Sequence, residues 1–99
     1  MIADDQPETL HDQGCVYATQ AAADSAAAFW RCGFEEARRR LTELALDAQH
    51  KGDRADGTEY WRLQSRAAGV DMSLSVSMEG DLAVIVAASF RRRGKKRRR

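Results

Sequence analysis

Residues 70–90 read VDMSLSVSMEGDLAVIVAASF, and this stretch decides the fold. Its first half alternates strictly between apolar residues (Val70, Met72, Leu74, Val76, Met78) and polar ones (Asp71, Ser73, Ser75, Ser77, Glu79). This period of two predicts a strand with one buried face. Glu79-Gly80-Asp81 predicts a turn, and the β-branched run within 82–90 predicts a second strand. The end of the domain is therefore expected to be a β-hairpin.

A three-residue turn sets the register that we expect for this hairpin. It pairs apolar residues on one face, namely Met78–Leu82, Val76–Val84, Leu74–Val86, Met72–Ala88 and Val70–Phe90. A shift by one residue would place serines on that face. An isolated hairpin is marginal in water, so we expect helices to cover its apolar side. The uncovered edge of the second strand would invite a second copy, which predicts a homodimer with a joined four-stranded sheet.

A long amphipathic helix is predicted upstream of the hairpin. It begins near Asp24 or Ser25, either of which can cap it, and ends near Gly52. Its apolar stripe recurs at steps of three and four residues: Trp30, Phe34, Ala37, Leu41, Leu44 and Ala48. On its other face Glu35 and Glu36 stand four residues before Arg39 and Arg40, the order that favours ion pairs.

A second, shorter helix is predicted over residues 57–68. Asp56 followed by Glu59 has the form of a capping box, and Tyr60, Leu63 and Ala67 would share one face. The short connection between the two helices predicts an antiparallel helical hairpin. The expected fold class is therefore α+β, with an antiparallel helical hairpin packed on a C-terminal β-hairpin.

Charge is divided unevenly along the 99 residues. The formal net charge is only +1, yet residues 1–90 hold 8 Arg/Lys against all 15 Asp/Glu, and residues 91–99 hold the other 8 Arg/Lys and no acid. We therefore divide the chain into a flexible acidic arm (1–14), a single α+β domain (15–90) and a disordered Arg/Lys tail (91–99).

The tail, RRRGKKRRR, resembles in composition the arginine-rich segments of RNA-binding and nuclear-import peptides. Guanidinium groups bind phosphate oxygens bidentately and stack on unpaired bases, so we expect the chain to bind RNA or DNA. No aromatic residue is interleaved, which predicts phosphate contacts without sequence specificity. The expected nucleic-acid-binding residues are Arg91, Arg92, Arg93, Lys95, Lys96, Arg97, Arg98 and Arg99. Two other roles stay open. The tail could be a solubilising end or an anchor for anionic surfaces, or it could dock on the acidic body of its own or another subunit.

The alternative is a protein-binding adaptor or inhibitor, encoded by a phage or mobile element, that acts through its acidic helical face. Glu35 and Glu36 would form that face, and Trp61, off the main apolar stripe, would anchor the partner if it is exposed.

Enzymatic and metal chemistry are not expected from these motifs. The His and Cys residues are His11, Cys15, Cys32 and His50, and the last two would lie about 27 Å apart on one helix, too far for a shared zinc ion. Asp53 to Glu59 resembles a calcium loop only faintly, because Ala55 stands where an oxygen ligand is needed. Without a signal peptide or a membrane-spanning run, we expect a cytoplasmic protein with free thiols, no cofactor and no membrane partner.

Overall fold

The computed structural model describes residues 9–12 and 15–92. In chain order the elements are η1 (Leu10–Asp12), β1 (Cys15–Ala18), α1 (Gln20–Trp30), α2 (Phe34–Ala45), β2 (Gln49–Asp53), β3 (Glu59–Ser65), β4 (Val70–Glu79) and β5 (Leu82–Arg92). The fold is α+β, as the sequence predicted, with two helices and a five-stranded sheet in the described ranges.

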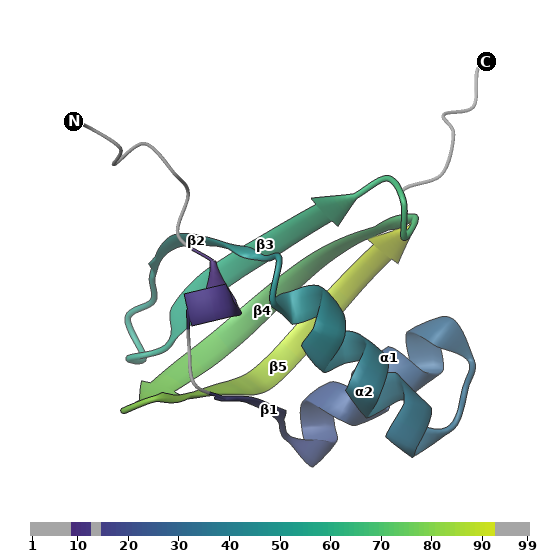
Figure 1. Cartoon of the computed structure of the whole chain (residues 1–99), viewed down its shortest axis with the longest axis horizontal. Helices are drawn as coiled ribbons and strands as arrows, with labels where there is room; N and C mark the ends of the chain where they lie inside the picture. The colour runs from purple at the N-terminus through teal and green to yellow at the C-terminus, as the bar shows by residue number, and fades with distance from the viewer. Residues whose placement is uncertain (1–8, 13–14, 93–99) are drawn as a thin grey trace.

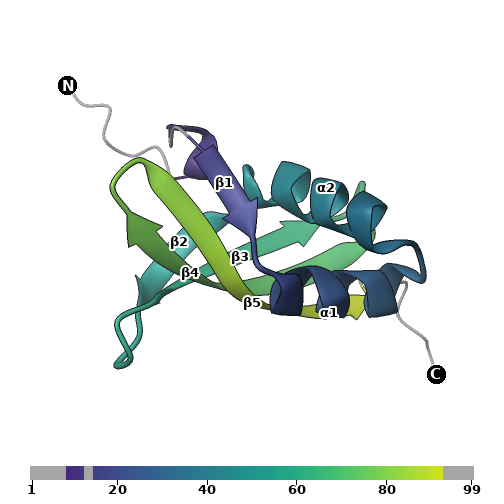
Figure 2. The same cartoon turned by 90° about the horizontal axis from the view of Figure 1, so that it is seen from below.

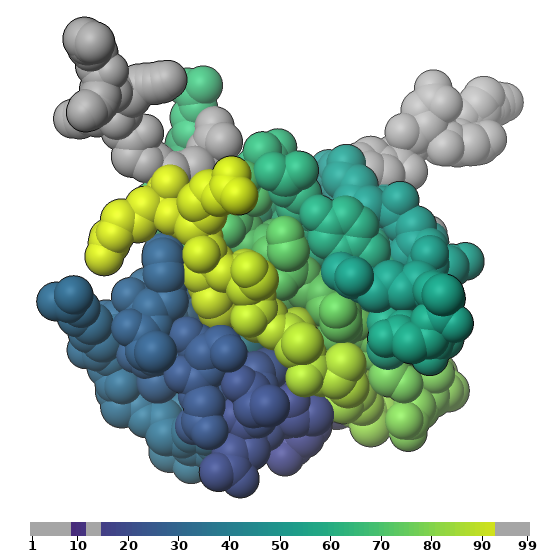
Figure 3. Space-filling view, turned by 180° about the vertical axis from the view of Figure 1, so that it is seen from behind, coloured from purple at the N-terminus to yellow at the C-terminus, as the bar shows by residue number. Residues whose placement is uncertain are grey.

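The sheet has the strand order β1-β5-β4-β3-β2. Neighbours from β2 to β5 pair antiparallel, and β1 pairs parallel with β5. Both helices lie on one side of the sheet (Figures 1 and 2). Seen from the other side, β5, β4 and β3 form a surface that the helices leave uncovered (Figure 3). One face of the sheet therefore belongs to the core, and the other faces solvent.

Small helical residues pack against larger residues of the sheet to form the core. The helices contribute Ala22, Ala26, Ala37, Leu41 and Ala45, and the sheet contributes Trp61, Leu63, Val70, Met72, Leu74, Val76, Ala83 and Ile85. All of these are buried. In residues 70–76 the apolar side chains thus face the core and the polar side chains face the open side of the sheet, as their alternation predicted.

The segment expected as one long helix from Asp24 to Gly52 forms two helices, and its last residues, from Gln49, belong to strand β2 instead. Thr19, and not Asp24 or Ser25, caps α1 by accepting a hydrogen bond from the Ala22 N–H. Arg31 then adopts the left-handed conformation, with φ 57° and ψ 51°, which ends α1 before Gly33 starts α2. The apolar stripe continued across this break, so its period concealed the break.

The helix expected over residues 57–68 is wrong, because this segment is strand β3. Asp56 does not open a capping box; it accepts hydrogen bonds from the hydroxyl and the N–H of Thr58, which hold the pKa of Asp56 below its ordinary value. β3 then alternates buried Trp61 and Leu63 with Arg62 and Gln64, and it pairs with β4 along its whole length. Tertiary pairing overrides the local helical spacing here.

The β4–β5 hairpin is present, but its expected register is wrong. Glu79 pairs with Leu82 across a two-residue turn, so Ala83 and Ile85 face the core. Val86 is an extra residue on β5, because Val76 pairs with Ile85 and Ser75 with Ala87. This β-bulge shifts the phase of the strand, and Ala88 and Phe90 then pack against the core. The outer edge of β5, expected to be open for a second copy, is covered by β1 along residues 82–85.

Both ends of the expected domain lie beyond their predicted boundaries. Leu10 is fully buried in the core, and Thr9 forms a β-bridge with Gln49, although both fall in the expected acidic arm. At the other end β5 includes Arg91 and Arg92. Residues 1–8 and 13–14 of the arm and residues 93–99 of the tail lie outside the described residues. Neither helix in the described ranges has the length and apolar character that crossing a membrane requires.

Candidate nucleic-acid interface

The basic run, residues 91–99, begins on the last strand of the sheet. Arg91 and Arg92 are the final residues of β5, and both are exposed. Arg91 pairs in register with Asp71, and Arg92 pairs with Val70. Because successive residues of a strand point to opposite faces, Arg91 lies on the open face and Arg92 on the face that carries the helices.

Arg92 lies against a cluster of three aromatic rings, which we call the aromatic cluster: Phe29, Trp30 and Phe90. The Phe29 and Phe90 rings stack with centroids 5.1 Å apart, and Trp30 is tilted against Phe90 at 5.2 Å. The guanidinium carbon of Arg92 is 5.4 Å from the Phe29 centroid, and that of Arg40 is 5.1 Å from the Trp30 centroid. Both distances allow a cation–π interaction, so two arginines flank half-buried rings.

Arg31 ends helix α1, and two of the three residues of the aromatic cluster lie at that helix end. Phe29 and Trp30 are the last two residues of the helix, and the backbone N–H of Arg31 closes it by donating to the Ala27 carbonyl. Phe90 reaches the same place from β5 only because the bulge at Val86 has changed the phase of that strand. The cluster therefore joins residues 60 positions apart in sequence.

A mainly apolar groove adjoins the aromatic cluster. It has a volume of about 340 Å³ and is lined by Trp30, Arg40, Glu43, Leu44 and Ala68. The groove runs between α2 and the turn that joins β3 to β4. Its size suits a single planar ring, and its position beside Trp30 would let that ring stack.

Cations outnumber unpaired acids at this end of the sheet. Arg40 is paired with Glu36 at 2.9 Å, and Arg39 lies 3.9 Å from Glu43. Arg31, Arg66 and Arg92 are exposed and form no ion pair with another described residue. These three guanidinium groups remain available to phosphates.

Asp71 is the main acid near Arg91, and its charge is already neutralised. Arg62 Nε and Nη2 donate to its two carboxylate oxygens at 3.1 and 2.8 Å. Hydrogen bonding from Arg62 holds the pKa of Asp71 below its ordinary value, against the opposing effect of burial, with further help from the charges of Arg62 and Arg91. Arg91 therefore lies near a carboxylate that is already paired with Arg62.

The expected protein-interface residues are not brought together. Trp61 is only 1% exposed, since it lies on the core side of β3 and its indole N–H donates to Glu59. It is therefore not available as a surface anchor. Glu35 and Glu36 are exposed in the first turn of α2, where acids favour the helix dipole. The Glu36–Arg40 pair is present as expected, whereas Arg39 lies near Glu43 and not Glu35.

The sequence indicated Arg91 and Arg92 but did not show what surrounds them. Of the eight expected tail residues, Arg93, Lys95, Lys96, Arg97, Arg98 and Arg99 lie outside the described residues. Phe29 went unnoticed as a neighbour of the tail because only the packing of α1 on β5 brings it near Arg92. Phe90, the residue before the basic run, was the one local signal.

Comparison with known proteins identifies no relative of this chain. No protein family, curated protein or solved structure matches it. The function of this end of the sheet is therefore inferred from the contacts of its own residues.

Proposed function

We propose that this protein binds nucleic acid without sequence specificity, and that the end of β5 is where the strand is held. In this proposal the basic run contacts phosphates, while the aromatic cluster and its groove accept an unstacked base. The contact that carries the proposal is that of Arg92 with Phe29, at 5.4 Å from the ring centroid. It tethers the basic run to a rigid strand beside stacking surfaces, with no intervening linker.

Single-stranded RNA or DNA suits this arrangement better than a duplex. Unpaired bases can leave the stack and pack on aromatic side chains, and base–aromatic stacking contributes about 1–3 kcal/mol for each base. A duplex offers only its phosphates to such a surface. Arg31, Arg66 and Arg92 would then follow the backbone while the groove holds one ring.

Salt dependence tests the proposal on the full-length protein. Fluorescence anisotropy with a labelled single strand of about 20 nucleotides, between about 50 and 200 mM salt, gives log Kd against log salt. If all eight cations of residues 91–99 contact phosphates, the slope should have a magnitude of about 6, at about 0.7 per contact on single strands.

A charge-neutralised variant measures how much of the salt dependence of binding comes from the basic run. Replacing the six cations of residues 93–99 by Ser in the full-length chain should lower the slope by about 4. Arg54→Gln is the matched control, because Arg54 also stacks on a ring, that of Tyr60 at 4.9 Å, but on the loop between β2 and β3. Binding that survives the six replacements with an unchanged slope would refute the proposal.

A protein-binding adaptor that acts through Glu35 and Glu36 remains the alternative, and it has lost Trp61 as its anchor. Self-association also remains a proposal. The edge strands of the described sheet are β1 and β2, so a second copy would pair on one of these or on the part of β5 beyond residue 85, which β1 does not cover.

A further inference from the structure

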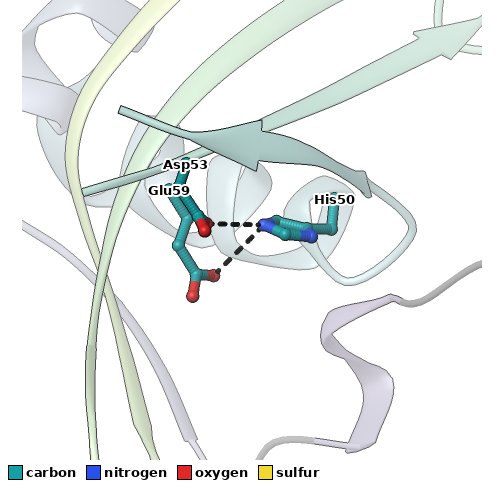
Figure 4. A group of neighbouring side chains, drawn as sticks. All are labelled: His50, Asp53 and Glu59. Carbon is teal, nitrogen blue, oxygen red and sulfur yellow. Dashed lines mark hydrogen bonds and ion pairs between the residues drawn. The ribbon is translucent and has the colours of Figure 1, made fainter. Parts of the chain in front are cut away.

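The β2–β3 hairpin brings together one histidine and two carboxylates. His50 lies on β2, Asp53 ends the same strand, and Glu59 begins β3. The His50 Nε2 atom is 3.3 Å from Asp53 Oδ1 and 3.9 Å from Glu59 Oε1. One ligand atom from each residue lies within 4.8 Å of the others. The three side chains point toward one another beside the 54–58 loop that joins the two strands (Figure 4).

A β-bulge makes this convergence possible. Residues three apart on a regular strand point to opposite faces, so His50 and Asp53 would be separated. Here His50 pairs with Trp61 and Gly52 pairs with Tyr60, which leaves Lys51 as an extra residue on β2. The shift returns Asp53 to the face of His50, directly opposite its register partner Glu59. Bulges of this kind re-aim side chains and are frequent beside functional sites.

Trp61 fixes two of the three groups from the core. Its indole N–H donates to Glu59 Oε1 at 3.0 Å, and its ring lies 5.1 Å from the His50 ring. Trp61 is only 1% exposed, so it cannot move freely. Outer hydrogen bonds to a ligating carboxylate orient it and tune its affinity. Asp53, whose side chain is 78% exposed, closes the group from the solvent side.

We propose that His50, Asp53 and Glu59 bind a divalent transition-metal ion such as Zn²⁺. An imidazole nitrogen favours Zn²⁺ over Mg²⁺ or Ca²⁺, and two carboxylates supply the negative charge that a dication needs. Tetrahedral ligands at about 2.1 Å from zinc are about 3.4 Å from each other. The observed separations of 3.3 and 3.9 Å need only small side-chain rotations to reach that geometry. Three protein ligands leave the fourth position to water or to a ligand.

Titration of the full-length protein with Zn²⁺ tests this site by isothermal calorimetry. One equivalent should bind, and His50→Gln and Asp53→Asn should each weaken the affinity at least about tenfold. The matched control is His11→Ala, since His11 is the second of the two histidines and also contacts a carboxylate, Asp47 at 2.6 Å. That variant should bind within about twofold of the unchanged protein, as should Cys15→Ser, which removes the exposed thiol.

A spectroscopic readout locates the ion independently of its affinity. In a Trp30→Phe background, Ni²⁺ or Cu²⁺ should quench the fluorescence of Trp61, and Asp53→Asn should move that quenching to at least about tenfold higher metal concentration while leaving the far-UV circular dichroism unchanged. Asp53 is on the surface, so this variant should fold even if His50→Gln does not. The proposal is overturned if no Zn²⁺ binds at about millimolar concentration, or if binding depends on His11 or Cys15 and not on His50 and Asp53. In that case the three groups form only a cluster of polar contacts between neighbouring side chains.

Discussion

The Arg62–Asp71 pair should stabilise the fold in a pH-dependent manner, and Arg62→Gln measures the effect. The pair is bidentate, with N–O distances of 3.1 and 2.8 Å. The Asp71 side chain is 12% exposed, but that of Arg62 is 37% exposed, so solvent screens part of the attraction. We therefore expect a loss of about 1 kcal/mol at neutral pH, the upper range for exposed pairs, and a fall in Tm of about 4–8 °C.

The sign of the pH dependence follows from the lowered pKa of Asp71. Its ordinary value is 3.8, and hydrogen bonding from Arg62 lowers it in the folded state. The unfolded chain therefore binds the proton first as pH falls. The contribution is complete above about pH 5 and is lost as pH falls below 3.8 through the folded pKa. Thermal melts of the unchanged protein and of Arg62→Gln should thus differ by a constant amount from about pH 5 to 8 and approach each other as the pH falls below 3.8.

Two controls make this experiment decisive. Arg66→Gln removes a cation that forms no ion pair with another described residue, so its melts should follow the unchanged protein at every pH. Asp71→Asn should cost a similar amount at neutral pH, and the double variant should show coupling, because the two groups share one interaction. Arg91, also near Asp71, reduces both the cost of losing Arg62 and the pH-dependent part of that cost, because both depend on how strongly the cations hold Asp71 ionised. A difference that persists undiminished at pH 2, or full additivity, would refute the reasoning.

Three further perturbations have defined outcomes. Arg31→Gly should raise the free energy of unfolding by up to about 1 kcal/mol in urea titrations, because Gly adopts φ 57° without strain; a loss would contradict the assigned helix end. Leu10→Ala should cost about 3 kcal/mol in the same assay, since Leu10 is fully buried, and a cost below about 0.5 kcal/mol would show that this segment does not pack. Arg92→Gln should weaken single-strand binding about fivefold near 0.1 M salt and lower the slope by about 0.7, whereas Arg54→Gln should change neither; equal effects of the two would place the strand elsewhere.

The sequence predicted those elements whose pattern is both long and local. Residues 70–79 alternate over ten positions, and β4 spans that range. β3 was missed because Asp56 and Glu59 mimic a capping box. Only pairing with β4 decides between helix and strand for the seven residues Glu59–Ser65. β1 has four residues and exists through its parallel pairing with β5, which no local signal announces.

The candidate sites divide in the same way. Arg91 and Arg92 were recognisable because charge density is a property of composition. The aromatic cluster was not, since Phe29 and Phe90 meet only through the packing of α1 on β5. His50 and Glu59 were assigned to the end of one helix and the start of another, and nothing in that assignment turned their side chains toward each other. A hairpin pairing of residues 49–53 with 59–62 would have shown their proximity, because Asp53 and Glu59 are register partners.

The extra residue at Val86 gives β5 one residue more than its pairing with β4 needs. Val86 is only partly buried, so its side chain can change without disturbing the core. Loss of one residue at the bulge would leave a regular strand, in which Ala87 still pairs with Ser75 and Phe90 with Met72. Phe90 and Arg92 would therefore stay on the face that carries the helices, whereas loss of a second residue between Ile85 and Phe90 would turn Phe90 to the solvent face. Homologues of this chain should therefore tolerate substitution and a single deletion at position 86, but not the loss of two residues there.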